Sequence, residues 1–363
     1  MGQGCQSGGY QTGILKAART TPGPLQMSMA TSAQSLLGMA TGFWISRALY
    51  VAAKLGIADL VGESARTPEH LARTVQVNGD ALRRVLRVLA SVGVFMEDPE
   101  GNFANTPTSE LLRIGTPGSL HGFIVMLGEK ESWRAWEEIL HSVRTGEPAF
   151  RQAFGCTIFE YLERNPEAAR LFDEGMLSRG AEDDEVILQT FDFSGAAEIV
   201  DVGGGRGSLL AAVLKAQPRA HGTLFELGHV AKSAEDSFDP GLRSRCRFAP
   251  GDFFNDGLPR GADFYILKKV LHDWPNEQAR RILKTCHAAM SDRSTLLVIE
   301  PIVPIGNEPS LAKLFDLFML VWPGGRERTE AEHRDLLASA DLTLSRVIRT
   351  GSAISVLEVH KGA

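Results

Sequence analysis

The spacing of apolar residues changes about halfway along the chain. In the first half the spacing is helical, and from about residue 197 short apolar strands alternate with helices. Residues 120–190 keep the helical pattern and are rich in aromatic side chains, which is more typical of a packed core than of a ligand site. We therefore expect a helical N-terminal region followed by an α/β domain. The clearest helical face, at positions i, i+3, i+4 and i+7, consists of Leu82, Val85, Leu86 and Leu89.

The first helical region resembles a winged helix. Thr67 can cap a helix that Pro68 opens, and the polar segment 76–79 separates this helix from the next one. A turn sequence, Asp-Pro-Glu-Gly at 98–101, then lies between two strand-like segments, which predicts a hairpin. Helix, turn, helix and hairpin in this order are typical of a winged-helix domain.

The charge of the chain decides how this domain is interpreted. Its second helix carries Arg83, Arg84 and Arg87, where a repressor carries the residues that read DNA. The whole chain, however, has 38 Lys and Arg against 44 Asp and Glu, a net charge of −6, whereas phosphate contacts require a basic face. We interpret the arginines as a solvated or interface face and expect no nucleic-acid partner.

Other features argue against several classes of protein. The four cysteines lack Cys-x-x-Cys spacing, so neither a zinc ribbon nor a disulfide scaffold is expected. No apolar run approaches the ~18 residues of a membrane span, and no charged segment followed by an apolar stretch marks a secretory signal. Residues 1–30 are rich in Gly, Gln, Ser and Thr without periodicity, which predicts a flexible tail. The expected location is cytoplasmic.

The second half predicts a doubly wound sheet. A helix at 209–216 follows the first strand, and another at 277–290 precedes the fifth. Strands that alternate with helices form a mostly parallel sheet covered on both faces. The expected strands are 198–202, 223–227, 247–249, 264–267 and 296–299, with a closing hairpin formed by 342–348 and 354–359.

Four glycines directly follow the first expected strand and precede its helix. Glycine lets the backbone turn sharply and approach a ligand at the carboxyl end of a strand, and the helix N-terminus behind it favours an anionic group. A dinucleotide-binding fingerprint fits poorly, because its third glycine would fall at Ser208. The spacing is instead Asp201-x-Gly203-x-Gly205-x-Gly207. A carboxylate in that place suits an ammonium group better than a pyrophosphate, which is the pattern of an S-adenosylmethionine site.

Three further segments are expected at the same edge of the sheet. Glu226 ends the second strand, where an acid can accept hydrogen bonds from ribose hydroxyls; the alternative is a surface acid. The segment 251–254, Gly-Asp-Phe-Phe, is either an ordinary turn or a contact for adenine. His272 leaves the fourth strand among polar neighbours. A lone histidine is more often structural, but this position suits catalysis.

In order and spacing, these motifs resemble the class I small-molecule O-methyltransferases. That family includes the caffeate, acetylserotonin, hydroxyneurosporene and bacterial antibiotic-tailoring enzymes, and the resemblance covers about residues 35–363. One departure is Glu226-Leu227-Gly228, where the family has Asp-Leu-Pro. The motifs that carry the resemblance are 201–207, 251–254, 268–274, Glu300-Pro301 and 323–329.

The resemblance implies a fold, an activity and partners. The fold would be a Rossmann-like, mostly parallel seven-stranded sheet behind a winged-helix-like dimerisation domain. Its boundaries would give a tail at 1–30, the dimerisation domain at 31–115, a helical linker and substrate-pocket region at 116–190 and a catalytic domain at 191–363. The enzyme would transfer a methyl group from S-adenosylmethionine to an aromatic hydroxyl of a specialised metabolite such as a phenazine or polyketide. S-adenosylhomocysteine would be the product, no metal would take part, and the chain would form a homodimer.

The resemblance also assigns roles to residues. His272 would be the general base, with Glu300 and Glu327 flanking it and holding its orientation. The residues that bind the cofactor would be Asp201, Gly203, Gly205, Glu226, Leu227, Gly251, Asp252, Phe253 and Lys268. The residues that bind the acceptor would be Phe172, Met176, Asp273, Met319 and Trp322.

Three alternatives stay open. Some members of the family bind the cofactor but catalyse decarboxylation or hydroxylation, although the presence of His272, Glu300 and Glu327 favours methylation. An NAD-dependent oxidoreductase would share the sheet and the ribose-binding acid. A winged-helix regulator with a ligand-sensing domain would share the N-terminal helices.

Overall fold

The structure is a computed structural model that describes residue 1 and residues 32–362, and for 177–182 it describes the backbone alone. Two compact units make up the chain, residues 1–46 and 47–363, and the second contains the sheet and the glycine motif. The tail expected at 1–30 lies outside the described residues, apart from residue 1. The domain boundaries expected near 115 and 190 stay predictions.

Helix α1 (Ser32–Lys54) carries large apolar side chains that are exposed. By length and composition alone it is able to cross a membrane, with a mean hydropathy of 1.3. The expectation that no segment is that apolar was therefore wrong, because Gly, Ser and Thr interrupt the apolar run without lowering its mean hydropathy far. Buried helices of soluble proteins and signal sequences have the same properties, so this is weak evidence for a membrane. The exposed residues are Leu36, Leu37, Met39, Phe43, Trp44 and Ile45.

The winged-helix prediction is confirmed. Thr67 caps the second helix of the domain by accepting a hydrogen bond from the N–H of His70 at 3.1 Å. Leu82, Leu86 and Leu89 of the predicted helical face are buried. The elements are α2 (Ile57–Val61), α3 (Pro68–Thr74) and α4 (Gly79–Ser91), followed by the antiparallel strands β1 (Phe95–Glu97) and β2 (Phe103–Asn105).

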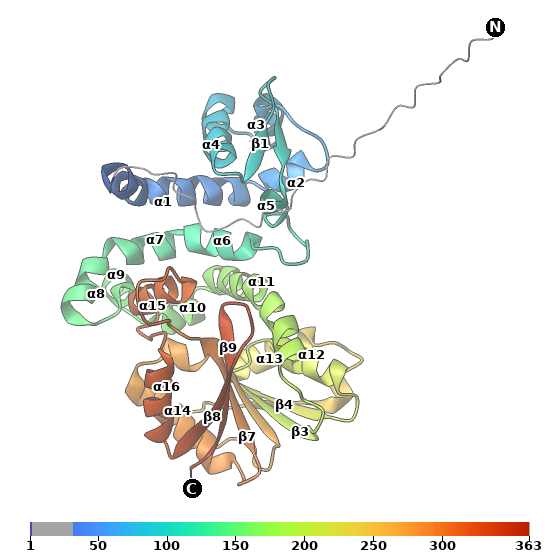
Figure 1. Ribbon diagram of the computed structural model, residues 1–363, viewed down its shortest axis with the longest axis vertical. Coiled ribbons are helices and arrows are strands. Elements are labelled where there is room, and N and C mark those ends of the chain that lie inside the picture. Colours follow the sequence, from blue (N-terminus) through green and yellow to red (C-terminus); the bar gives the residue numbers. More distant parts are fainter. Residues whose placement is uncertain (2–31, 363) are drawn as a thin grey trace. The chain divides into compact units, whose positions relative to one another are not determined.

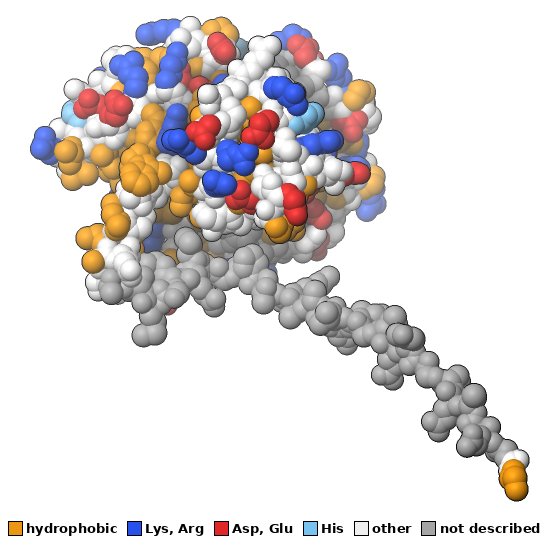
Figure 2. Space-filling model, turned by 90° about the horizontal axis from the view of Figure 1, so that it is seen from above, with side chains coloured by type: hydrophobic (Ala, Val, Ile, Leu, Met, Phe, Trp, Pro, Cys, Tyr) orange, Lys and Arg blue, Asp and Glu red, His pale blue; other side chains and the backbone are white. Residues whose placement is uncertain are grey.

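The three arginines of α4 all have acidic partners. Arg83 pairs with Glu69 at 2.5 Å, Arg84 with Asp80 at 2.9 Å and Arg87 with Glu97 at 3.1 Å. Figure 2 shows basic and acidic side chains interspersed over one face of the molecule. These pairs support the interpretation of this helix as a solvated or interface face.

Seven helices connect the hairpin to the sheet. The first long one, α6 (His121–Gly128), crosses α11 (Pro166–Thr190) at close range, because a Cβ at Gly122 would lie 2.8 Å from the carbonyl oxygen of Glu174. Glycine at this crossing lets the two backbones approach. The other helices are α5 (Pro107–Glu110), α7 (Lys130–Glu137), α8 (Ile139–Thr145), α9 (Ala149–Phe154) and α10 (Ile158–Arg164).

The remaining chain forms a seven-stranded sheet with the order β5-β4-β3-β6-β7-β9-β8. Strands β3 to β7 are parallel, and β9 runs antiparallel to both of its neighbours. The order reverses between β3 and β6, where open α/β sheets bind ligands at the carboxyl ends of the strands. The strands are β3 (Glu198–Val202), β4 (His221–Glu226), β5 (Cys246–Pro250), β6 (Phe264–Lys268), β7 (Thr295–Pro301), β8 (Leu342–Arg349) and β9 (Ile354–Lys361).

Helices cover both faces of the sheet, as expected for a doubly wound α/β domain (Figure 1). One buried apolar cluster joins the sheet to α12 and α13, and a second joins it to α14 and α16. The sheet is thus a rigid platform for the loops at its carboxyl edge. These helices are α12 (Ser208–Ala216), α13 (Gly228–Ser237), α14 (Asn276–Ala289) and α16 (Glu330–Ala338); α15 (Leu311–Val321) precedes α16, and η1 (Arg243–Arg245) and η2 (Leu271–Asp273) are short 3-10 turns.

Candidate active site

The glycine turn lies between β3 and α12 and depends on its glycines for two different reasons. Gly203, Gly205 and Gly207 have positive φ angles of 68°, 58° and 72°, a region that other residues rarely adopt. At position 204 glycine is required because there is no room for a side chain. A Cβ there would lie 2.7 Å from Oδ1 of Asp201 and closer still to its Oδ2 and Cγ. The sequence motif pointed to this turn but not to the role of Gly204.

Asp201 is buried beneath this turn at the end of β3. Its Oδ1 has no hydrogen-bond partner within the described chain. Burial raises the pKa of the Asp201 carboxyl to about 7, although Lys268 opposes the shift. A buried carboxylate oxygen without a partner is costly, and a ligand ammonium group would supply both a hydrogen bond and a compensating charge. The geometry therefore fits the expected amino end of S-adenosylmethionine.

Glu226 ends β4 and connects two parts of the same edge. Its carboxylate accepts hydrogen bonds from the N–H of Gly205 at 3.1 Å and from the N–H of Leu227 at 2.8 Å. Burial raises the pKa of Glu226, while these hydrogen bonds lower it. Leu227 is half-exposed beside it. An acid held in this way is not an ordinary surface acid.

The segment after β5 lies next to the glycine turn, and its contact with the turn is the ring of Phe253. A Cβ at Gly203 would lie 3.5 Å from the ring of Phe253. Gly251 packs against Phe225, since a Cβ there would lie 2.5 Å from Cε2 of its ring and closer still to Cζ. The Asp252 carboxylate accepts hydrogen bonds from its own turn, from the N–H of Phe254 at 2.9 Å and the amide of Asn255 at 2.6 Å. Asp252 therefore shapes this turn, whatever it contacts in addition.

Two lysines at the end of β6 pair with two aspartates of α11, which the sequence motifs did not indicate. Lys268 pairs with Asp184, and Lys269, which has a φ of 54°, pairs with Asp183 at 2.5 Å. All four side chains are largely buried. The pairs fasten α11 to the edge of the sheet where Asp201 lies.

His272 lies in the turn after β6 and is almost fully buried. Its Nδ1 is 2.9 Å from Oε1 of Glu327, its backbone N–H donates to Oε1 of Glu300 at 2.8 Å, and its Nε2 is 3.6 Å from Oδ1 of Asp273. Burial alone lowers the pKa of His272, but Asp273, Glu327 and Glu300 outweigh it and raise the pKa to about 9. Glu300 and Glu327, the two acids predicted to flank this histidine, are thus brought to it, and Asp273, predicted as an acceptor residue, lies beside it as well.

The segment 323–329 holds the turn that carries His272. Arg328 is buried and donates hydrogen bonds to the carbonyl of Leu271 at 3.0 Å and to that of Trp274 at 2.9 Å, on either side of the histidine. A Cβ at Gly325 would collide with the carbonyl oxygen of His272 and lie 2.8 Å from the Cα of Asp273. The resemblance included this segment without giving these two residues a role.

A second buried histidine faces the same acids, and the sequence interpretation missed it. His333 of α16 is fully buried, and its Nε2 lies 3.8 Å from Oε2 of Glu300. Among the described residues, neither ring nitrogen of His333 nor Oε2 of Glu300 has a hydrogen-bond partner. Burial lowers the pKa of His333 to about 4 and raises that of Glu300 to about 7. The sequence feature that could have indicated His333 is its place on the apolar face of a helix, three and four residues before Leu336 and Leu337.

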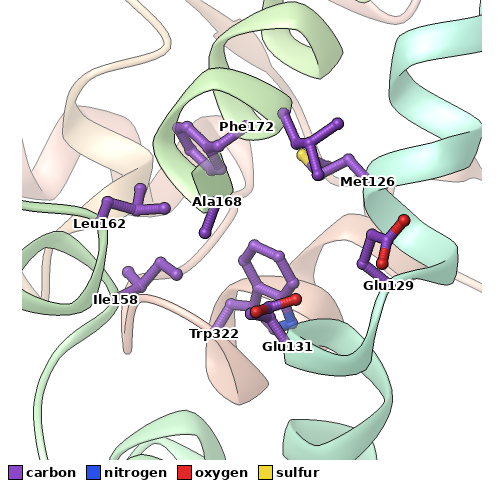
Figure 3. Close-up of a pocket in the computed structure, with 9 residues that line it drawn as sticks. Met126, Glu129, Glu131, Ile158, Leu162, Ala168, Phe172 and Trp322 are labelled. Carbon is purple, nitrogen blue, oxygen red and sulfur yellow. The ribbon is translucent and has the colours of Figure 1, made fainter. Parts of the chain in front are cut away.

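Phe172 and Trp322, two of the predicted acceptor residues, line one cavity (Figure 3). Their rings stack with centroids 6.4 Å apart. Met176 is partly exposed and Met319 is buried, and neither is among the residues that line this cavity. The lining residues are Met126, Glu129, Glu131, Ile158, Leu162, Ala168, Leu171, Phe172 and Trp322. The described residues hold no cluster of three or more His, Cys, Asp or Glu suited to a metal ion.

Comparison with known proteins matches both halves of the chain. The family model of the O-methyltransferase domain matches residues 136–342, and that of the O-methyltransferase dimerisation domain matches residues 37–113. Phenazine O-methyltransferase PhzM of Lysobacter antibioticus is 43% identical over 90% of this chain and 95% of its own length. The mitomycin biosynthesis 6-O-methyltransferase of Streptomyces lavendulae is 38% identical over 96% and 100%. The crystal structure of human N-acetylserotonin methyltransferase with SAM is 27% identical with a TM-score of 0.85, covering 93% and 99% of the two chains.

Proposed function

The chain belongs to the O-methyltransferase family and is an S-adenosylmethionine-dependent O-methyltransferase; from this premise we propose that it methylates a phenol-type hydroxyl of a small aromatic specialised metabolite, with His272 as the general base. The observation that carries the proposal is the buried His272 with Glu327 on one ring nitrogen and Asp273 near the other. The curated relatives tailor phenazine and mitomycin compounds, which supports a metabolite of this kind.

The residues of the glycine turn suit the cofactor. Asp201 would receive its ammonium group, Glu226 its ribose hydroxyls and Phe253 its adenine, with Gly203 and Gly205 against its methionine end. The cofactor, when bound, supplies a methyl group activated by a positively charged sulfur. Correct alignment of the acceptor contributes much of the rate of such a displacement.

His272 is suited to take the proton of the acceptor hydroxyl at Nε2. Glu327 accepts a hydrogen bond from Nδ1–H, which fixes the tautomer and leaves Nε2 free to accept a proton. A phenol titrates near ~10 and the pKa of His272 is about 9, so the neutral form of His272, which accepts the proton, becomes more populated as the pH rises through 9. Glu327 then stabilises the imidazolium that forms. Glu300 holds the backbone of the same turn.

The proposed function is tested with purified protein, labelled donor and a panel of aromatic hydroxyl compounds. A product heavier by one methyl group, carried on oxygen, is the expected result. Some relatives are N-methyltransferases, so the site of methylation is determined by NMR spectroscopy. A product that has lost carboxylate or gained a hydroxyl without a methyl group would contradict the proposal. Thermal stabilisation by NADH but not by S-adenosylhomocysteine would favour the oxidoreductase alternative.

We infer further that the chain works as a homodimer in the cytoplasm. The dimerisation domain match and the exposed apolar residues of α1, among them Phe43 and Trp44, support self-association. Light scattering coupled to size-exclusion chromatography is expected to give twice the mass of one chain. A monomer at micromolar concentration would contradict the dimer, and recovery with membranes after cell fractionation would contradict the location.

A further inference from the structure

Arg206 is the one charged residue in the glycine turn at 203–207, and nothing so far gives it a role. It lies between Gly205 and Gly207, whose positive φ angles of 58° and 72° turn the backbone sharply on either side of it. The N–H of Gly207 donates to the carbonyl of Gly204 at 2.9 Å and closes the turn. The same turn that covers Asp201 therefore fixes the backbone of Arg206.

The guanidinium group of Arg206 has a donor that the described chain does not satisfy. Its Nε is buried and has no hydrogen-bond partner among the described residues. Its ion-pair partner is Asp173 of α11, but the distance from Nη2 to Oδ2 of Asp173 is 3.6 Å, which is longer than a hydrogen bond. A buried N–H without an acceptor is costly. A ligand can reach this group, because the side chain is 36% exposed and a Cβ at Gly205 would meet nothing within 4 Å.

The two lysines at the same edge of the sheet are engaged more closely than Arg206. Lys268 donates a hydrogen bond to Asp184 of α11, and Lys269 donates one to Asp183 at 2.5 Å. Both lysine side chains are largely buried in these pairs. Of these three cations, Arg206 is the one whose ion pair exceeds hydrogen-bond distance, so its charge is the least compensated.

Asp201 and Arg206 bring opposite charges to one turn. The Asp201 carboxylate is almost fully buried with an unpartnered Oδ1, directly beneath Gly204 and two residues before Arg206. Helix α12 begins after Gly207, which makes no side-chain cap hydrogen bond, and its N-terminus adds positive potential on the Arg206 side. A ligand that carries an ammonium group and a carboxylate on one carbon atom matches this arrangement of charge.

We propose that Arg206, at the N-terminus of α12, binds the carboxylate of the methionine end of S-adenosylmethionine. The inference rests on the proposed placement of the cofactor's ammonium group at Asp201 and adds the anion-binding half of the same subsite. Guanidinium and carboxylate form short, charge-assisted hydrogen bonds, and the Nε of Arg206 gains the acceptor that the described chain lacks. A ligand without the carboxylate leaves this donor unpaired and loses about tenfold or more in affinity.

The experiment measures binding rather than turnover. Isothermal titration gives dissociation constants for S-adenosylhomocysteine and for its decarboxylated analogue, which keeps the amine, the ribose and the adenine. The wild-type protein is expected to bind S-adenosylhomocysteine about tenfold or more tightly than the analogue. Arg206→Gln should remove this preference by weakening S-adenosylhomocysteine binding alone. Arg219→Gln, which removes a charge from an exposed position beyond the other end of α12, should leave both affinities unchanged.

A second variant separates charge from geometry. Arg206→Lys keeps the charge but loses the Nε donor and the planar fork, so its affinity for S-adenosylhomocysteine should lie between those of the wild type and Arg206→Gln. The melting temperature without ligand shows that each variant folds.

Four results would overturn the inference. They are wild-type affinity for S-adenosylhomocysteine in Arg206→Gln, equal weakening of both ligands in that variant, equal binding of both ligands by the wild type, and a loss in Arg206→Gln confined to a carboxylate-bearing acceptor such as a hydroxynaphthoate. The last would assign Arg206 to the acceptor instead. The proposed function stands in all four cases, whereas a wild-type protein that does not bind S-adenosylhomocysteine would contradict both.

Discussion

Replacing Gly204 with alanine tests how the glycine turn holds Asp201. The new Cβ would lie 2.7 Å from Oδ1 of Asp201 and even closer to two other atoms of that carboxylate. Asp201 is buried on a strand hydrogen-bonded on both sides, by β4 and β6, so it cannot move away freely. Overpacking of this kind costs about 1–3 kcal/mol. If the strain displaces the carboxylate that receives the cofactor's ammonium group, affinity falls about 5- to 150-fold.

The assay is isothermal titration of S-adenosylhomocysteine, with the melting temperature measured in parallel. Gly257→Ala is the matched control, because a Cβ there meets nothing within 4 Å. Gly205→Ala separates the two roles of glycine, since its φ of 58° is strained for alanine although the space is open; a loss of about 1 kcal/mol is expected there. Wild-type affinity in Gly204→Ala would show that the turn does not hold Asp201 in its binding position, whether or not the melting temperature falls.

Three further substitutions probe the histidine site. Asp273, Glu327 and Glu300 together raise the pKa of His272 to about 9. Glu327→Gln removes one of these charges, so the rise of kcat/KM with pH should shift toward lower pH by about one unit or more; an unshifted profile would contradict this. Gly325→Ala forces a Cβ onto the carbonyl of His272 and should reduce kcat while leaving S-adenosylhomocysteine affinity unchanged; the reverse pattern would place the effect in the cofactor site. His333 has a pKa of about 4 in the fold and ~6.5 when unfolded, so it destabilises the fold progressively as pH falls from 6.5 to 4, by about 3 kcal/mol in all. In His333→Phe the free energy of unfolding should depend less on pH between 4 and 6.5 than in the wild-type protein. Equal slopes for the variant and the wild type would contradict the low pKa of His333.

The sheet could be predicted because its strands are short, apolar and bounded by turn residues. The first strand was expected at 198–202 and is found there. The second strand begins at His221, two residues earlier than expected. Its start was predicted too late because Gly222 has little strand preference of its own. Its backbone is held by packing, because a Cβ at Gly222 would lie 3.0 Å from Cγ of Leu210. Tertiary contact decides such boundaries.

The residues at the strand ends could be predicted for a geometric reason. Parallel strands bring their carboxyl ends to one edge, so Asp201, Glu226 and His272 were expected near one another. The sequence did not indicate that Asp184 and His333 lie near that edge. They lie on helices whose contact with the sheet depends on packing of the whole domain, and neither forms part of a local motif.

The acceptor side was only partly predictable. Phe172 and Trp322 line the cavity, but its lining also contains Glu129 and Glu131, which lie in a helical stretch that sequence interpretation assigned to core. Burial of a charged residue cannot be recognised from helical periodicity alone, because the same spacing describes a solvated face. The fold brings Glu131 to Tyr161 and into the same lining as Trp322, which are 30 and more residues away in the sequence.

His272 as the general base is tested most directly by methyl transfer in the His272→Ala variant, with an acceptor that the wild-type protein methylates, measured together with S-adenosylhomocysteine affinity. Loss of a general base should lower kcat by about 10²- to 10⁴-fold, and cofactor affinity should stay at the wild-type value because Asp201 and Glu226 are unchanged. Full methyl transfer by this variant would contradict the assignment of His272 as the base.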